Sequence, residues 1–296
     1  MRRVLAVACL LVLVGACATS GTPFTSQSPE PAASPNVSAT IVATASPQPT
    51  PTPREEPPAV AADPVAISAQ IAVAERAVRD PGIDGALLAW MGHLQQRIYR
   101  AIAARPEWRD AFLAAVPVEL RTAVTANLDA TSDLRATVVP GPDLPTAWRI
   151  VEPAPLEDLS RFYHEAETEF GVPWAYLASI HLVETRMGRI RGTSVAGAQG
   201  PMQFMPGTWA AYGEGDVNSN RDAIRAAARY LRANGAPANM PNALFRYNNS
   251  QRYVRAVTAY AEVMRAEPSA YRGYYHWQVY YLTTKGDILL PVGYGR

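Results

Sequence analysis

The stretch SIHLVETRMG, residues 179–188, places a carboxylate among apolar side chains. Its pattern and that of the residues before it predict a helix, with successive side chains about 100° apart. On that projection Leu177, Ile180 and Met187 lie within about 60° of Glu184. A glutamate on the apolar face of a helix needs a chemical reason, because carboxylates are seldom buried without a partner.

The predicted position of Glu184 favours a raised pKa. Burial disfavours the charged form, and so does the negative end of the helix dipole. A carboxyl group that stays protonated near neutral pH can act as a general acid. The alternative, which spacing leaves open, is a glutamate that faces solvent or pairs with nearby cations. The candidate cations are Arg186, Arg189 and Arg191.

A glycine-rich loop follows, GAQGPMQFMP at residues 197–206. Gly197 and Gly200 allow the backbone to approach a ligand closely. Gln203 offers two donors and one acceptor, a set suited to hydroxyl and acetamido groups. Pro206 at the end of the loop, with Thr208, predicts the start of a short helix. In the helix that carries Glu184, Pro173 suits the first turn and Gly188 suits the C-terminal end.

A third segment, FRYNNSQRYVRAVTAYAEVM at residues 245–264, has a Tyr-Asn pair before another predicted helix. In this order, the three segments resemble the lytic transglycosylase family, which shares the goose-type lysozyme fold. That family has a glutamate at the end of a helix, a Gly-x-x-Gly-x-Met-Gln-x-Met-Pro loop and a Tyr-Asn motif. The resemblance covers about residues 155–265. One departure is Thr185, because serine usually follows the glutamate in the family.

The resemblance implies that Glu184 is the catalytic residue, with Tyr247 donating a hydrogen bond that orients it. It also implies a set of substrate-binding residues around the glutamate. These are Thr185, Met202, Gln203, Phe204, Tyr247 and Asn248. Met202, Phe204 and Met205 would wall the site and keep it dry, although core packing is an equal explanation for Phe204 and Met205.

The activity that the resemblance implies is cleavage of the β-1,4 bond between N-acetylmuramic acid and N-acetylglucosamine in peptidoglycan. Glu184 would protonate the glycosidic oxygen, then take the proton of the C6 hydroxyl as a 1,6-anhydro ring closes. Most glycosidases use two carboxylates, but no second one is marked by its spacing here. Two alternatives stay open: a goose-type muramidase that hydrolyses the same bond, and a non-catalytic peptidoglycan-binding lipoprotein.

The N-terminus, MRRVLAVACLLVLVGACATS, has the pattern of an export signal. Two arginines precede a short apolar run, and LVGAC resembles a bacterial lipobox that would leave Cys17 as the lipidated first residue. The alternative is an ordinary secretory signal with a chance cysteine. We therefore expect an exported bacterial lipoprotein, held in the cell envelope by a membrane anchor.

Composition divides the rest of the chain. After the signal peptide, at residues 1–17, a Pro/Thr/Ser/Ala-rich segment over 18–62 predicts a disordered linker. Helical periodicity over 63–150 predicts an accessory domain, which begins with Asp63 as a cap. The catalytic domain would occupy 151–268, and the aromatic tail at 269–296 predicts a β-hairpin with its turn at residues 285–287. The expected fold is mainly α, with a lysozyme-like catalytic domain.

Charge and cysteine content exclude several classes of function. The formal net charge is +1, without the concentrated basic face of a nucleic-acid-binding protein. Both cysteines lie in the first 17 residues, so the folded part has no cysteine metal site. Acidic residues at 214–222 match a calcium loop poorly, since Ser219 and Arg225 stand where an EF-hand needs glycine and glutamate. We expect no metal, no cofactor and a monomer, with peptidoglycan strands and the membrane as partners.

Overall fold

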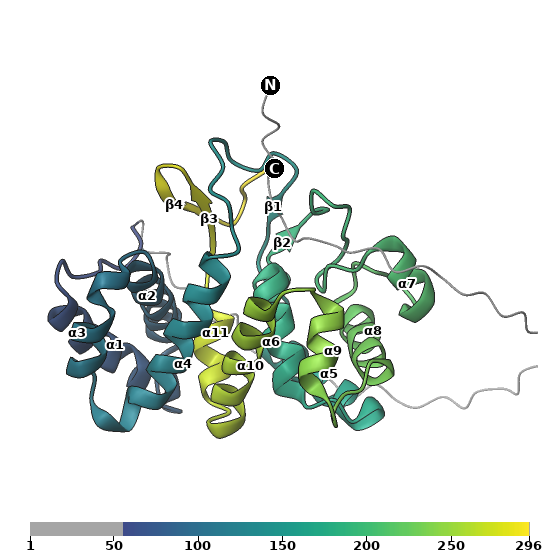
Figure 1. The fold of residues 1–296 in the computed structure, drawn as a ribbon, viewed down its shortest axis with the longest axis horizontal. Helices are drawn as coiled ribbons and strands as arrows, with labels where there is room; N and C mark the ends of the chain where they lie inside the picture. The colour runs from purple at the N-terminus through teal and green to yellow at the C-terminus, as the bar shows by residue number, and fades with distance from the viewer. Residues whose placement is uncertain (1–55, 296) are drawn as a thin grey trace, which may run out of the picture. The chain divides into compact units, whose positions relative to one another are not determined.

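The computed structural model describes residues 56–295. The predicted signal peptide, the lipidation site Cys17 and most of the predicted linker lie outside the described residues. The described part is mainly helical (Figure 1). The helices are α1 Pro64–Arg79, α2 Gly85–Ala103, η1 Pro106–Trp108, α3 Arg109–Ala115, α4 Val118–Arg135, α5 Leu156–Phe170, α6 Trp174–Thr185, α7 Pro206–Tyr212, α8 Asn220–Ala233, α9 Met240–Tyr247, α10 Gln251–Ala266 and α11 Ala270–Tyr275.

Two short antiparallel sheets complete this part of the chain: β1 Arg149–Ile150 with β2 Ile190–Arg191, and β3 Val279–Thr283 with β4 Gly286–Leu290. Within residues 56–295 no helix is both long and apolar enough to span a bilayer.

Local sequence signals explain where several helices begin. The Asp63 carboxylate accepts the backbone N–H groups of Val65 and Ala66, and Pro64 occupies the first helical position, as predicted. Helix α7 likewise begins at Pro206. Helix α8 begins after Ser219, whose hydroxyl accepts the backbone N–H of Asp222.

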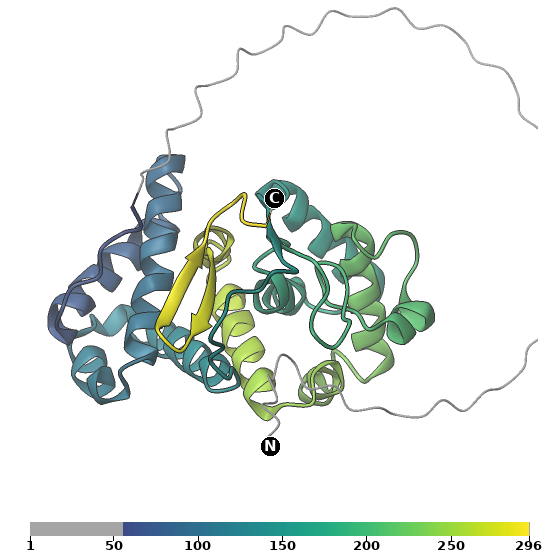
Figure 2. The same cartoon turned by 90° about the horizontal axis from the view of Figure 1, so that it is seen from above.

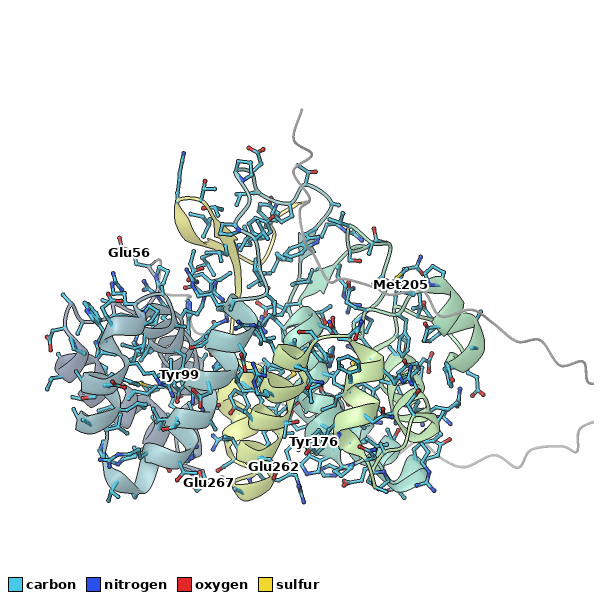
Figure 3. The ribbon with its side chains drawn as sticks, in the orientation of Figure 1. Glu56, Tyr99, Tyr176, Met205, Glu262 and Glu267 are labelled. Carbon is cyan, nitrogen blue, oxygen red and sulfur yellow. The ribbon has the colours of Figure 1, made fainter. Side chains whose placement is uncertain are left out.

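One hydrophobic core runs through the described helices. Helix α10 packs against α4 on one side and α6 on the other, and α1 packs against α2. The Tyr176 hydroxyl of α6 donates to the carboxylate of Glu262 on α10, at 2.9 Å (Figure 3). Thr131 of α4 bonds to Tyr260 of α10, also in the core. The helices before residue 150 thus share a core with those after it, and the domain division at 150 stays a prediction.

The predicted hairpin is present as β3 and β4, with Thr283 opposite Gly286, so its turn residues are Thr284 and Lys285. This places the turn slightly earlier than the predicted 285–287. The hairpin lies beside α2 and α4 when seen from above (Figure 2). Asp287 binds Arg100 of α2 and Arg135 of α4, at 2.6 and 3.0 Å. These ion pairs tie the C-terminal strands to the N-terminal helices.

Candidate active site

Helix α6 is buried on almost every side, because nearly all its side chains are apolar or small. It ends at Thr185, where Arg186 and Met187 adopt left-handed φ angles of 54° and 60°. The helix therefore ends before Gly188, the predicted stop. Left-handed backbone at non-glycine residues is strained and is concentrated at functional sites. Here it begins two residues after Glu184.

Glu184 is partly buried near the C-terminus of α6. Burial raises the pKa of its carboxyl group to about 7, and a hydrogen bond from Tyr253 opposes that rise. The Tyr253 hydroxyl donates to Oε1 of Glu184 at 2.8 Å. A substantial fraction of a carboxyl group with this pKa is protonated near neutral pH. The same residue can then serve as an acid when protonated and as a base when ionised.

The three arginines that could have neutralised Glu184 bond elsewhere. Arg186 donates to the carbonyl of Leu182, Arg191 donates to the carbonyl of Asn218, and Arg189 forms an ion pair with Glu152 at 3.2 Å. The alternative in which Glu184 pairs with one of these arginines is therefore wrong. Tyr253 is the partner that the structure gives to the carboxylate.

Tyr247 has a different position from the one expected. Its hydroxyl donates to the backbone carbonyl of Met202 at 2.7 Å, not to Glu184. Its ring stacks on that of Tyr253, with centroids 6.5 Å apart and planes 6° apart. The hydrogen bond predicted for Tyr247 is thus made by Tyr253, six residues later on α10, whereas Tyr247 at the end of α9 contacts Tyr253 and the loop.

Sequence reasoning missed Tyr253 because nothing local marks it. It is the third residue of α10, and the Ser250 hydroxyl that caps this helix accepts its backbone N–H. The capping serine was a usable signal for where α10 begins. Which of the two tyrosines reaches Glu184 depends on how α10 packs against α6, and no sequence spacing reports that.

The glycine-rich loop folds back on itself. Gln199 and Phe204 exchange two backbone hydrogen bonds of 2.8 Å each, which closes the loop. Within it, Gln203 adopts a φ of 51°, and its side-chain amide donates to the carbonyl of Gly200 at 2.9 Å. One Gln203 donor is thus used inside the loop, and its second N–H and its carbonyl oxygen remain for a ligand.

Gly200 is required by packing as well as by its φ of 71°. A Cβ atom at this position would lie 1.9 Å from the carbonyl oxygen of Val217. Gly197 also has a positive φ, of 89°, but a Cβ there would meet no atom within 4 Å. The backbone at Gly200 therefore lies close to another part of the same chain, whereas the space beside Gly197 is open.

Three of the predicted substrate-binding side chains are buried: Thr185, Met202 and Phe204. The Thr185 hydroxyl donates to the carbonyl of Pro201 at 2.6 Å and accepts the N–H of Gly188. It therefore joins the end of α6 to the loop. Phe204 makes edge contacts with Trp209 and Tyr247. Contact between these residues and a substrate stays a prediction.

The remaining predicted residues are more accessible. Gln203 and Asn248 are both partly buried, and Asn248 is the C-cap residue of α9. Met205, at the end of the loop, is the N-cap residue of α7 and is also partly buried. The structure thus brings the loop, the end of α6 and the start of α10 to one place, around Glu184.

Three carboxylates near Glu184 in sequence form ion pairs with α8. Glu165 and Glu169 of α5 form ion pairs with Arg221 and Arg225 of α8. Glu214 pairs with Arg229 of α8 at 2.9 Å. These pairs hold α5, α8 and the 214–222 segment together.

His181 lies on α6, three residues before Glu184, and is fully buried. Its Nδ1 bonds to the Tyr163 hydroxyl at 2.7 Å, and burial lowers the pKa of its ring to about 3. It is therefore a neutral packing residue. Over residues 56–295 no group of three or more His, Cys, Asp or Glu side chains is arranged to hold a metal ion. In the 214–222 segment, Asp222 accepts the N–H of Asp216 instead.

The chain is similar to a membrane-bound lytic murein transglycosylase F from Thiobacillus denitrificans. The two are 29% identical over 127 residues, which is 40% of this chain and 27% of the relative. The match thus spans about a quarter of the relative's length. No family model matches the chain. No solved structure matches it either. A weak relationship to lytic transglycosylases and a mainly helical fold are what the comparison and the structure together support.

Proposed function

We propose that this protein is a peptidoglycan lytic transglycosylase. It cleaves the β-1,4 bond between N-acetylmuramic acid and N-acetylglucosamine and leaves 1,6-anhydro ends. The observation that carries the proposal is the partly buried Glu184 carboxyl, held by Tyr253, with a pKa of about 7. A group with this pKa can change protonation state twice in one catalytic cycle at neutral pH.

Glu184 first donates its proton to the glycosidic oxygen, so that the bond to the muramoyl C1 breaks. The acetamido oxygen of the same sugar stabilises the developing positive charge. Ionised Glu184 then removes the proton of the C6 hydroxyl, whose oxygen bonds to C1 and closes the anhydro ring. The proton returns to Glu184, and no water is consumed.

A mechanism with one carboxylate agrees with the surroundings of Glu184. Enzymes with two catalytic carboxylates hold them roughly 5–10 Å apart across the scissile bond. Glu165 and Glu169 of α5, and Glu214, form ion pairs with arginines of α8. The acetamido group of the substrate takes the place of a second carboxylate in the proposed reaction.

The test is mass spectrometry of the soluble products released from purified peptidoglycan by the wild type and by Glu184→Gln. Anhydro-muropeptides from the wild type and none from the variant are expected. Reducing-end products that also depend on Glu184 would make the protein a muramidase. No product from either form, with unchanged binding to peptidoglycan, would make it a non-catalytic binding protein.

We further propose that Cys17 carries a lipid and anchors a monomeric chain in the cell envelope, with residues 18–62 as a spacer. The signal-like N-terminus and lipobox-like LVGAC support this. The matched relative is named as membrane-bound. Metabolic labelling with a fatty acid should mark the wild type and leave Cys17→Ala unlabelled. Label on both forms would contradict the proposal.

A further inference from the structure

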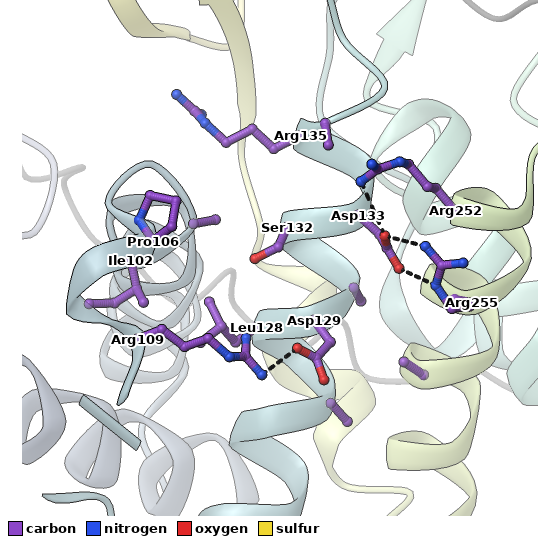
Figure 4. A pocket seen from close by; sticks show the side chains of 15 residues that line it. Ile102, Pro106, Arg109, Leu128, Asp129, Ser132, Asp133, Arg135, Arg252 and Arg255 are labelled. Carbon is purple, nitrogen blue, oxygen red and sulfur yellow. Dashed lines mark hydrogen bonds and ion pairs between the residues drawn. The ribbon is translucent and has the colours of Figure 1, made fainter. Parts of the chain in front are cut away.

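A groove lies over α4, between the end of α2 with η1 on one side and α10 on the other (Figure 4). It encloses about 890 Å³. Small residues of α4 and its C-cap residue lie along it: Ala126, Ala130, Ser132 and Ala136. Between the charged residues, the floor is therefore formed by small side chains, and the larger Leu128 is almost fully buried.

The charged side chains that line the groove are mainly basic. Its charged lining residues are Arg109, Arg135, Arg252, Arg255, Asp129 and Asp133. This lining has two more cations than anions, although the whole chain is almost neutral. A groove of this kind is complementary to an anionic ligand.

The ion pairs of the lining leave arginine donors for such a ligand. Arg255 makes two hydrogen bonds to Asp133, of 2.8 and 2.6 Å, whereas Arg252 reaches the same carboxylate only at 3.5 Å. The Arg252 side chain is 50% exposed. Arg135 shares one carboxylate, that of Asp287, with Arg100. Planar guanidinium groups with free donors suit bidentate binding of carboxylates.

Helix α10 links this groove to the candidate active site. Arg252 and Arg255 of α10 line the groove. Tyr253, between them in sequence, donates to Glu184. The groove and the candidate active site thus share the N-terminal part of α10.

We propose that the groove binds the carboxylate-bearing peptide stem that branches from the glycan strand. This inference rests on the proposed function, since it takes peptidoglycan as the substrate. The stem is attached to the muramoyl sugar, the sugar whose bond is cleaved at Glu184. Its extended backbone fits over the small residues of α4, and its carboxylates pair with Arg252 and Arg135. The stem thereby positions the strand for cleavage.

The first experiment measures binding without cleavage. An N-acetylated stem tetrapeptide, free of sugar, is titrated into the full chain and followed by calorimetry. We expect Arg252→Ala to weaken binding roughly fivefold, the upper range for a half-exposed charge pair. Arg265→Ala is the matched control. Arg265 lies on the same helix, is 51% exposed and pairs with Glu262, but it is outside the groove, so that variant should bind like the wild type.

Two probes define the ligand class. The same peptide with its carboxylates converted to amides should bind less tightly than the parent. Vesicles of phosphatidylglycerol test an anionic membrane surface as the occupant. Arg252-dependent binding of vesicles with no binding of the peptide would overturn the proposal. Equal peptide affinities in the wild type, Arg252→Ala and Arg265→Ala would also overturn it, once thermal melting shows that both variants are folded.

A second experiment compares cleavage of peptide-bearing and peptide-free glycan. The preference for peptide-bearing strands, taken as the ratio of kcat/KM values, should fall about fivefold in Arg252→Ala and stay unchanged in Arg265→Ala. Failure of this proposal and of the catalytic one are distinct. If the protein binds the stem peptide but cleaves no glycan, the stem-binding proposal holds and the catalytic proposal is wrong. If it cleaves peptide-bearing and peptide-free glycan equally well, the catalytic proposal holds and the stem-binding proposal is wrong.

Discussion

Glu184 links the chemistry of the site to the stability of the fold. Its carboxyl group has a pKa of about 7 in the folded chain, raised by burial from the ordinary value of 4.5. Since the folded state holds this proton more tightly than the unfolded state, Glu184 favours folding most at low pH. That contribution is complete below pH 4.5 and is lost as the pH rises to about 7.

Glu184→Gln should remove this dependence on pH. The free energy of unfolding of the variant, relative to the wild type, is expected to rise between pH 4.5 and 7 by up to about 3 kcal/mol, and to change little above pH 7. Urea denaturation at a series of pH values measures it. A difference between the two proteins that stays constant over this range would show that Glu184 is not held in a desolvated site.

Tyr253→Phe tests the hydroxyl that holds Glu184. That hydrogen bond stabilises the ionised carboxylate and lowers its pKa, so its loss should raise the pKa above about 7. The alkaline limb of the kcat/KM profile, where Glu184 ionises, should move to higher pH. The rate should also fall roughly ten- to a hundredfold as the carboxyl loses its orientation.

Tyr247→Phe is the control for that experiment. It removes a hydroxyl that donates to the Met202 carbonyl, not to Glu184. We expect lower stability of the loop, but the alkaline limb of the kcat/KM profile should stay at the same pH as in the wild type. A shift of the limb in Tyr247→Phe, and none in Tyr253→Phe, would restore the role that the family resemblance implied for Tyr247.

At the scale of single elements, the glycine-rich loop depends on two glycines in different ways. Both have positive φ, which costs a residue with a side chain about 1–2 kcal/mol. At Gly200 the added Cβ also overlaps the Val217 carbonyl, at 1.9 Å, whereas at Gly197 it meets nothing within 4 Å. Val217 therefore leaves no room for a side chain at Gly200, but it does not restrict Gly197.

Gly200→Ala should consequently destabilise the chain by more than Gly197→Ala, whose cost should stay near the 1–2 kcal/mol of the backbone conformation alone. Thermal melting and chemical denaturation of the two variants give the comparison. If Gly197→Ala proved the more damaging, close contact with another molecule at Gly197 would explain the loop better than packing on Val217.

At the scale of the whole molecule, α10 joins the first helices to the site. It packs between α4 and α6, and it carries Tyr253, which holds Glu184, and Tyr260, which bonds to Thr131 of α4. The hairpin adds a second connection through Asp287. Helices predicted as an accessory domain therefore support the helix that orients the glutamate.

Residues 56–296 should accordingly unfold in a single transition. Fluorescence from chains that retain only Trp108, in η1, or only Trp174, in α6, reports on the two ends of the shared core. The two midpoints are expected to coincide in urea. A lower midpoint for Trp108 would instead support a separate accessory domain that ends near residue 150.

The sequence alone predicted the helices, the hairpin and the position of Glu184. Helical periodicity, capping residues such as Asp63 and the prolines act over a few residues, so they can be recognised without a fold. Glu184 was recognised because it lies in the first of three motifs that follow one another in the order of the family. These properties are local, and the structure has helices where those patterns predicted them.

Only the tertiary structure decided which groups meet at Glu184. Tyr253 and Tyr247 are six residues apart, and the packing of α10 on α6 determines that Tyr253 reaches the carboxylate. The same packing places Arg252 in a groove with α4, more than a hundred residues earlier in the chain. Contacts between distant segments depend on how helices dock, because side-chain periodicity specifies which face is buried but not which partner buries it.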